Sequence, residues 1–379
     1  MSILLTEDQK EIQAMVRDFV KKEFTWDVVR KYDEKGEFPM ELYKKVVEMG
    51  LPVLTIPEEF GGMDMGMKTW ALVSEELGYG DAGFAVSVGA QELASTPIML
   101  YGNDEQKADV AERLLNGQLA GFGLTEAASG SDAANCKTTA VRDGDHYILN
   151  GTKAFITNAG IAGFYTVFAS TDPEKKAKGI SAFIVEADRP GVSAGKEEDK
   201  MGIRLSHTAE LVLQDVRIPA KNLIGEEGMG FMYAMGTLER TRPAAAASAC
   251  GICQSAIDKC IEYAKVRKTF GKYLIEQQAI QYMLADMEIQ TQAARALLWK
   301  CADEIDAGKP NPILGCATKT FASDTAVKVA TDAIQIFGGY GFSREYPIEI
   351  LLRNAKIYQI FEGTNQIQRN VMGGLLAKR

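Results

Sequence analysis

Histidine is scarce in this sequence, because the 379 residues include only His146 and His207. A metal site built from several histidines is therefore excluded, and a Ser/His/Asp triad would have to use one of these two. His146 directly follows Asp143-Gly144-Asp145, a turn signature that favours a solvated loop position. We expect no metal site, and chemistry that relies on other side chains.

Long apolar runs are missing too. No segment approaches the roughly 18 apolar residues of a membrane-spanning helix. The first nine residues lack the basic and apolar stretches of a signal peptide. These absences predict a protein with no membrane span, located in the cytoplasm.

Positive charge is not concentrated anywhere along the chain. With 51 acidic against 42 basic residues the net charge is −9, so nucleic acid is not an expected partner. No GxGxxG opens a βαβ unit, and no GxxxxGK is followed by Ser or Thr. A dinucleotide would have to bind to another kind of fold.

Cysteine is present, but its pattern does not point to chemistry. Cys250 and Cys253 form a CxxC pair inside a run of small residues at positions 244–253 (AAAASACGIC). Small residues at helical spacing predict close packing of helices. We therefore do not expect redox or metal chemistry at this pair.

The spacing of apolar residues divides the chain into three regions. The chain has 46% hydrophobic and 25% charged residues, as folded globular proteins do, and its length predicts two or three domains. We expect a helical domain over residues 1–118, a β domain over 119–222 and a second helical domain over 223–379.

The first region carries helix start and stop signals. Thr6 and Gln9 read as a capping box that opens a helix. A second helix is expected after Pro39, ending at Gly50, where the C-cap rule favours glycine, and a third over about 67–77.

The second region has a period of two, with turn dipeptides at Asp143-Gly144 and Asn150-Gly151. The expected strands cover residues 138–142, 146–149, 154–157, 165–169, 180–186 and 211–218. Because no helices separate these strands, we expect an antiparallel sandwich or barrel.

The third region returns to helical spacing. Apolar residues from Ile280 to Cys301 predict a helix of more than 20 residues. Helices of this length usually belong to a bundle, and the outer face of a bundle often forms a subunit interface.

Two polar, glycine-rich stretches are candidates for ligand binding. Residues 122–132 offer hydroxyls and backbone N–H groups for a pyrophosphate, although an ordinary Ser/Gly/Asp loop has the same composition. Residues 361–369 contain Glu362 after an apolar stretch, where burial would raise its pKa and suit it to act as a base. A helix-ending Glu before a glycine fits equally well, so residue types alone leave both questions open.

These stretches belong to a set of seven motifs through which the whole chain resembles the acyl-CoA dehydrogenase family, and within it the short- and medium-chain, butyryl-CoA dehydrogenase-like members. The motifs are 56–62 (IPEEFGG), 124–132 (LTEAASGSD), 150–158 (NGTKAFITN), 200–204 (KMGIR), 267–272 (RKTFGK), 335–341 (QIFGGYG) and 360–368 (IFEGTNQIQ). The resemblance implies an N-terminal helical domain, a central antiparallel β-barrel or sandwich and a C-terminal four-helix bundle. It also implies FAD as the cofactor and a homotetramer built as a dimer of dimers.

The resemblance assigns FAD contacts residue by residue. Contacts implied along the flavin are Phe122, Leu124, Thr125, Gly130, Ser131, Phe155, Ile156 and Thr157, and further FAD contacts are implied at Thr364 and Gln366. Contacts implied from a neighbouring subunit are Arg267, Thr269, Gln278, Gln335, Gly338 and Gly339. Phe155 stands where the family usually has Trp, which keeps an aromatic plane but loses the indole donor.

For the reaction, the resemblance implies that Glu362 removes the α-proton of an acyl-CoA while the β-hydride leaves to flavin N5, giving a trans-2-enoyl-CoA. Electrons would then pass to an electron-transfer flavoprotein. Some members carry the base at the position of Thr241, but threonine cannot act as that base, so the assignment goes to Glu362.

Substrate contacts are implied at Ser131, Glu239, Thr241, Arg242 and Gly363. Residues 86–97, which contain Glu92, match the segment that lines the family's acyl pocket. Glu92 either points away and pairs with a surface cation, or it marks a pocket for a polar or cyclic acyl group. The alternatives are therefore a dehydrogenase or reductase of such an acyl-CoA and, more remotely, a catalytically silent binding or assembly protein.

Overall fold

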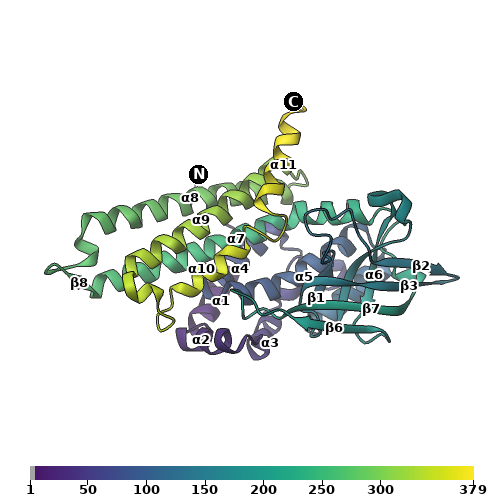
Figure 1. The fold of residues 1–379 in the computed structure, drawn as a ribbon, viewed down its shortest axis with the longest axis horizontal. Helices are drawn as coiled ribbons and strands as arrows, with labels where there is room; N and C mark the ends of the chain where they lie inside the picture. The colour runs from purple at the N-terminus through teal and green to yellow at the C-terminus, as the bar shows by residue number, and fades with distance from the viewer. Residues whose placement is uncertain (1–4) are drawn as a thin grey trace.

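The computed structural model describes residues 5–379 and places three parts in chain order, helical, β and helical (Figure 1). This order confirms the predicted fold class. In Figure 1 the long C-terminal helices lie side by side on one side of the molecule and the sheet lies on the other, with α4 and α5 between them. The N-terminal helices are α1 (Glu7–Glu23), α2 (Trp26–Lys35), α3 (Met40–Glu48), α4 (Gly66–Gly80), α5 (Ala82–Tyr101) and α6 (Asp104–Leu115).

The predicted helix signals in the N-terminal part are confirmed. The Thr6 hydroxyl accepts a hydrogen bond from the Gln9 N–H at 3.2 Å, and the Gln9 side chain accepts one from the Thr6 N–H at 3.1 Å. Helix α3 follows Pro39 and ends just before Gly50, whose φ of +72° suits glycine. Helix α4 runs longer than predicted because Asp81, which then caps α5, is the residue that stops it.

Helices also form the C-terminal part, and the longest is α7 with 37 residues. The elements are α7 (Gly230–Val266), β8 (Lys268–Thr269), β9 (Lys272–Tyr273), α8 (Gln278–Asp306), α9 (Pro312–Phe337), η6 (Gly338–Phe342), α10 (Glu349–Ile357) and α11 (Asn365–Leu376). Buried residues of α7, α8, α9 and α10 share one core cluster with α4, so the bundle and the N-terminal part pack as one body.

Helices α4 and α7 approach each other through glycines. A Cβ on Gly251 would lie 2.2 Å from the Glu75 carbonyl oxygen, and one on Gly78 would lie 2.6 Å from that of Ser248. Cys250 and Cys253 flank this contact as buried free thiols, and burial raises the pKa of Cys253 to about 12. The prediction that this pair marks close helix packing is confirmed.

The central sheet has seven strands in the order β1-β4-β2-β3-β7-β6, with β5 on the other edge of β4. The strands are β1 (Ala120–Gly123), β2 (Thr139–Asp143), β3 (His146–Thr157), β4 (Phe164–Ser170), β5 (Ile180–Glu186), β6 (Val192–Glu197) and β7 (Thr208–Pro219). The hairpin of β2 and β3 forms as predicted. The sheet is nevertheless mixed and not purely antiparallel, because β4 pairs in parallel with β1 and β2 after the intervening hairpin has returned the chain to the same direction.

The prediction of a turn at Asn150-Gly151 is wrong, because strand β3 continues through this dipeptide. The pairing of β3 with β7 shifts register between Leu149 and Gly151, which identifies a bulge. A Cβ on Gly151 would lie 2.5 Å from the Thr138 hydroxyl, so glycine is required by this close approach. The continuous β7 partner keeps the chain extended where the dipeptide alone suggested a reversal.

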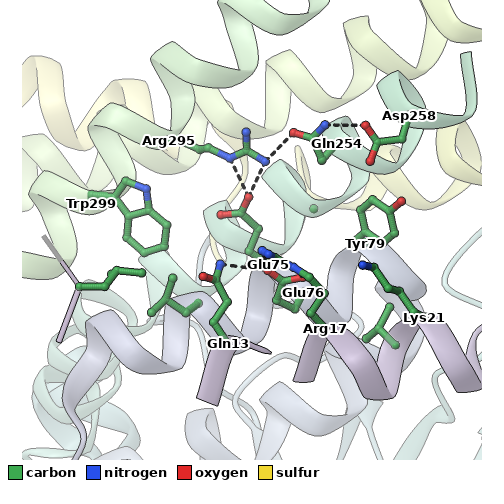
Figure 2. A pocket seen from close by; sticks show the side chains of 14 residues that line it. Gln13, Arg17, Lys21, Glu75, Glu76, Tyr79, Gln254, Asp258, Arg295 and Trp299 are labelled. Carbon is green, nitrogen blue, oxygen red and sulfur yellow. Dashed lines mark hydrogen bonds and ion pairs between the residues drawn. The ribbon is translucent and has the colours of Figure 1, made fainter. Parts of the chain in front are cut away.

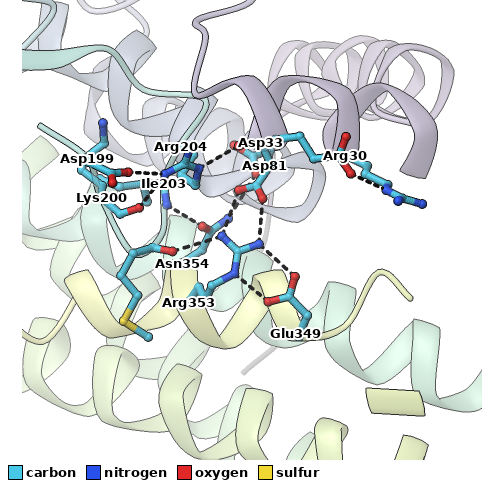
Figure 3. Close-up of polar contacts among 12 residues, drawn as sticks. Arg30, Asp33, Asp81, Asp199, Lys200, Ile203, Arg204, Glu349, Arg353 and Asn354 are labelled. Atoms are coloured by element: carbon cyan, nitrogen blue, oxygen red, sulfur yellow. Dashed lines mark hydrogen bonds and ion pairs between the residues drawn. The ribbon is translucent and has the colours of Figure 1, made fainter. Parts of the chain in front are cut away.

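A polar junction joins all three parts of the chain (Figure 3). The Arg353 guanidinium on α10 donates to the Asp33 carboxylate on α2 at 2.8 and 3.0 Å, and to Glu349 at 2.6 Å. Arg204, which follows β6, donates to the Asp33 carbonyl at 2.7 Å. Asn354 completes the junction by donating to the buried carboxylate of Asp81 at 3.1 Å. Among residues 5–379, no helix is long and apolar enough to cross a membrane.

Candidate active site

A cavity of about 410 Å³ lies where α5, α7, the ends of β1 and β3 and the turn before α11 meet. It gathers predicted site residues from all three parts of the chain. Those that line it are Glu92, Phe122, Leu124, Thr125, Gly130, Ser131, Phe155, Ile156, Thr157, Thr241, Arg242, Glu362 and Gly363.

Glu362 occupies a strained turn on the wall of the cavity. Its φ is +56° and that of the following Gly363 is +82°, so the chain turns sharply between α10 and α11. The Thr364 hydroxyl caps α11 by accepting from the Ile367 N–H at 3.1 Å, and the Gln368 amide donates to the Glu362 carbonyl at 2.8 Å. These local contacts fix the position of the Glu362 side chain.

The Glu362 carboxylate faces helix α7. The Thr241 hydroxyl donates to its Oε2 at 3.3 Å, so the two positions for which the resemblance implies a base lie opposite each other. Burial raises the pKa of Glu362, while the charges of Arg242 and Lys319 and the bond from Thr241 partly oppose that rise. A carboxylate whose pKa is raised in this way accepts a proton more readily than an exposed one.

Arg242 brings a buried cation to the same wall. It is only 7% exposed, and its Nη1 donates to the Cys316 sulfur at 3.6 Å. Within the described residues, the buried Nε of Arg242 has no hydrogen-bond partner. The cavity therefore carries positive charge beside the carboxylate.

The opposite wall is built on β3. Phe155 has a φ of +57° and is 64% exposed, so its ring faces the cavity and not the protein core. Beneath it, the Lys153 ammonium lies 2.7 Å from the Glu126 carboxylate, and the Ala154 N–H donates to the Thr125 carbonyl at 2.9 Å. Burial raises the pKa of Glu126, but Lys153 and Thr138 outweigh it and lower that pKa to about 2.

Glu92 on α5 lines the cavity. Hydroxyls of Thr55 and Thr96 donate to its carboxylate, the latter at 3.2 Å, and burial raises its pKa. From residue 5 onward, no ion pair involves Glu92. The expectation that it points away and pairs with a surface cation is therefore wrong.

Comparison with known proteins agrees with this architecture along the whole chain. Profiles of the acyl-CoA dehydrogenase N-terminal, middle and C-terminal domains match residues 6–118, 121–216 and 228–376. The chain belongs to the acyl-CoA dehydrogenase family. It is therefore related to oxidoreductases that use FAD.

Individual relatives show how close this kinship is. The short-chain specific acyl-CoA dehydrogenase of Megasphaera elsdenii is 44% identical over 384 residues, covering 100% of both chains. The structure of butyryl-CoA dehydrogenase from the same organism matches with a TM-score of 0.97 at 44% identity, again over 100% of both chains. A chain solved in work on the electron transferring flavoprotein of Acidaminococcus fermentans and flavin-based electron bifurcation gives the same TM-score, identity and coverage.

The cavity of this acyl-CoA dehydrogenase fits one face of a flavin. The exposed ring of Phe155 offers a flat apolar surface, and the side chains of Thr125, Ser131 and Thr157 offer hydroxyls along the same wall. A Cβ on Gly130 would meet nothing within 4 Å, so the loop there leaves open space for a ligand. These residues would hold the isoalloxazine ring of FAD and the part of the cofactor attached to that ring.

The residues expected to complete the FAD site from a neighbouring subunit lie elsewhere. Arg267 caps the far end of α7, 25 residues after Arg242, which at 1.5 Å per residue is roughly 38 Å along the helix. Figure 1 shows β8, which contains Thr269, at the end of the bundle farthest from the sheet. None of these six residues lines the cavity; they are Arg267, Thr269, Gln278, Gln335, Gly338 and Gly339.

Three other predicted residues lie near the cavity but do not line it. Thr364 is the N-cap of α11, and the exposed Gln366 lies in its first turn. Glu239 is half-buried on α7, two residues before Thr241. The structure thus places all three within one or two turns of the cavity wall.

Sequence reasoning missed the side chains that support the site. Lys153 and Lys319 are 0% and 1% exposed, yet lysine is the residue type least expected in a core. Lys153 and its partner Glu126 do occur inside two of the seven motifs, which was the available signal. Lys319 lies outside all of them.

A second cavity, of about 510 Å³, lies between α1, α4, α7 and α8 (Figure 2). Four of its charged groups form two ion pairs: Arg17 with Glu76 at 2.5 Å, and Arg295 with Glu75 at 2.6 Å. None of the predicted site residues lines it. This cavity is therefore a polar seam between helices, separate from the site around Glu362.

Proposed function

We propose that this acyl-CoA dehydrogenase converts a short- or medium-chain acyl-CoA into the trans-2-enoyl-CoA, with Glu362 as the base that removes the α-proton. The observation that carries the proposal is the Glu362 carboxylate, held on the cavity wall by a turn of positive φ with a raised pKa. An α-proton of a thioester is weakly acidic, so its removal needs a base sheltered from bulk water.

The backbone of the same residue has a second role in this proposal. In the part of the chain that the structure describes, the Glu362 N–H makes no hydrogen bond. It is free to donate to the thioester oxygen, where negative charge develops as the α-proton leaves. When bound, FAD supplies the acceptor for the β-hydride.

The FAD site is proposed to be shared between chains. The cavity residues from Phe122 to Ser131 and from Phe155 to Thr157, with Thr364 and Gln366, would hold the cofactor from one chain. Arg267 and its neighbours at the far end of the bundle would reach it from a second chain, in a homotetramer. The roughly 38 Å along α7 between the two groups supports this arrangement.

The coenzyme A part of the substrate is proposed to lie along Ser131 and the α7 segment that contains Glu239, Thr241 and Arg242. Ser131 is exposed at the cavity, and Gly363 lines it beside the base. A short acyl chain is supported by the relative described as short-chain specific.

An electron-transfer flavoprotein is the proposed acceptor of the electrons. The support is the 44% identity and 0.97 TM-score to a chain solved in work on such a flavoprotein. The purified, substrate-reduced enzyme should be reoxidised by an electron-transfer flavoprotein faster than by buffer alone.

The test is anaerobic bleaching of the yellow enzyme by butyryl-CoA. Wild type should bleach, whereas Glu362→Gln should keep its FAD and bleach at least about 100-fold more slowly, because an amide cannot accept the proton. Glu345→Gln, an exposed carboxylate far from the cavity, is the matched control and should bleach like wild type. Rapid bleaching of Glu362→Gln would overturn the assignment, and a wild type that binds no flavin would favour the non-catalytic alternative.

A second candidate function, dehydrogenation or reduction of a polar or cyclic acyl-CoA, is favoured by Glu92. Glu92 lines the cavity without an ion pair, and its carboxylate is held only by the hydroxyls of Thr55 and Thr96, so a plain fatty chain would lie near a poorly solvated polar group. In Glu92→Gln, the ratio of bleaching rates with butyryl-, hexanoyl- and cyclohexanecarboxyl-CoA should change. Unchanged ratios would remove this candidate.

A further inference from the structure

Lys319 is a buried lysine that the proposed reaction does not yet use. It lies in the middle of α9, and only 1% of its surface is exposed. Its ammonium donates to the Gly363 carbonyl at 2.8 Å and to the Asn365 side-chain oxygen at 2.9 Å. Both acceptors are uncharged, and among the described residues no ion pair involves Lys319.

An unpaired ammonium in a protein interior is costly, because burial removes its hydration. An apolar side chain of similar length would fill the same space without that cost. Retention of the charge therefore points to a use for it, and the first contact, the carbonyl of Gly363, directly follows the proposed base.

Lys319 supports the turn that carries Glu362. This turn has two consecutive residues at positive φ, Glu362 and Gly363, so it needs contacts that hold it in place. Gln368 supplies one contact from α11, and Lys319 supplies the other from α9. Both come from outside the turn, which fixes its position against the bundle.

The start of α11 rests on the same part of α9. Ser323, one helical turn after Lys319, accepts from the Asn365 amide at 2.9 Å, and Asp324 accepts from it at 2.8 Å. The Asn365 oxygen accepts from both Lys319 and Ser323. Lys319 is thus the charged member of a polar platform beneath the turn.

The charge of Lys319 also acts on the base. The charged groups that influence Glu362 are Arg242 on α7 and Lys319 on α9, and both oppose the rise in its pKa that burial causes. Asp324 on α9 lies within reach of Lys319 but is paired with Arg369 of α11 at 2.7 Å. Burial lowers the pKa of Lys319 to about 8, so its charge is present at neutral pH and is lost in more alkaline solution.

We propose that Lys319 is a positioning residue for the base: its ammonium fixes the turn at residues 362–363 and keeps Glu362 ionised, ready to accept the α-proton. The inference rests on the proposed function of Glu362. It assigns to α9, which does not line the cavity, a part in setting the pH range of the reaction.

The experiment compares Lys319→Met, Lys319→Gln and Lys319→Arg in the FAD-loaded enzyme. The measured quantity is the rate of anaerobic flavin bleaching by butyryl-CoA in single turnovers between pH 5.5 and 9. Loss of the charge in the Met and Gln variants should move the acid limb of the profile to higher pH by about one unit. Lys319→Gln, whose amide can still donate to Gly363, should keep a higher maximal rate than Lys319→Met. The acid limb of Lys319→Arg should lie at the same pH as that of wild type.

The control is Lys328→Met, which removes an exposed lysine two turns further along α9 and should change neither limb nor rate. If the acid limb of the pH–rate profile lies at the wild-type pH in both Lys319→Met and Lys319→Gln, the inference is overturned and Lys319 is a purely structural residue. If Lys319→Met does not fold, the Gln and Arg variants decide by the same criterion. Rapid bleaching of Glu362→Gln would instead refute the proposed function itself, so the two failures are distinguishable.

Discussion

The two groups of predicted FAD residues differ in almost every structural respect. The cavity group is enclosed by α5, α7 and the sheet, and its loops are fixed by a buried ion pair and by backbone hydrogen bonds. The distal group lies on the exposed end of the bundle, where the Arg267 guanidinium stacks 5.6 Å above the Tyr340 ring. One chain therefore presents a formed cavity at one place and a set of exposed polar groups at another.

The surroundings of the distal group suggest what covers it. Large apolar side chains are exposed at the end of α7, between β8 and β9, on α8 and in η6: Val266 (73%), Phe270 (99%), Tyr282 (63%), Ile289 (64%) and Phe342 (88%). Exposed apolar side chains of this size are typical of interaction surfaces. In the proposed shared site, cofactor binding and assembly would be linked, because one chain would supply the cavity and a second chain the distal group.

The largest expected effect is on stability, and it comes from breaking the buried Lys153–Glu126 ion pair that supports the cavity group. Lys153→Met leaves the Glu126 carboxylate buried without its cation, so the free energy of unfolding should fall by about 3–5 kcal/mol. Urea unfolding followed by tryptophan fluorescence measures this change. Lys137→Met removes an exposed lysine nearby and is expected to change stability by less than about 0.5 kcal/mol.

The same pair gives a pH dependence. Because the pKa of Glu126 is lowered to about 2, its contribution to stability is present above its ordinary pKa and is lost as the pH falls toward 2. The difference in stability between wild type and Glu126→Gln should therefore shrink between pH 5 and pH 2. A difference that stays constant over this range would show that the charge of Glu126 contributes nothing.

An intermediate effect is expected from the distal half. Arg267→Ala should weaken FAD binding by about 10- to 100-fold, because a charge-assisted contact to the pyrophosphate is lost. The dissociation constant can be measured by flavin fluorescence, with Lys265→Ala, one of the exposed cations of the same helix end, as the control.

The decisive extension is co-expression of Arg267→Ala with Glu362→Gln. If the site is shared, a cavity half from the first chain and a distal half from the second chain together make an intact site. At an FAD concentration too low to saturate Arg267→Ala, random pairing then restores about a quarter of the sites. If both chains assemble together but the mixture is no more active than Arg267→Ala alone at that FAD concentration, the two halves do not cooperate across chains.

The smallest effect is expected at Phe155. Phe155→Ala removes an aromatic face from the cavity and should weaken FAD binding by about 3- to 10-fold. Phe155→Trp, which introduces the residue that the resemblance implies at this position, should bind FAD at least as well as wild type. Equal affinity of the Ala variant and wild type would show that the exposed ring does not contact the cofactor.

Much of the fold could be predicted from local signals. The capping box at Thr6 and the glycine at position 50 act within a few residues, so the sequence alone contains the whole cause. The bulge at Gly151 and the parallel pairing of β1 could not be predicted, because each depends on a strand distant in the sequence. Local turn chemistry at residues 150–151 was overridden by the continuous pairing with β7.

The site shows the same division. Glu362 was found because a carboxylate before a glycine in a recognisable motif is a local pattern. Lys319 was not, because its place beneath the turn depends on a contact with Gly363, 44 residues away in the sequence. Glu92 is an intermediate case. Its segment could be placed at the pocket from the sequence, but the orientation of its side chain depends on contacts with Thr55 and Thr96.

The glycine contacts between α4 and α7 restrict how this sequence can change over time. At Gly78 and Gly251 even a methyl group would lie within 2.6 Å of backbone atoms of the opposite helix, so neither position can drift to another amino acid alone. Cys250 and Cys253, which flank the contact, are ordinary packing residues and can be exchanged for alanine or serine at small cost. In a lineage of this protein the two glycines should therefore persist while the more conspicuous cysteines come and go.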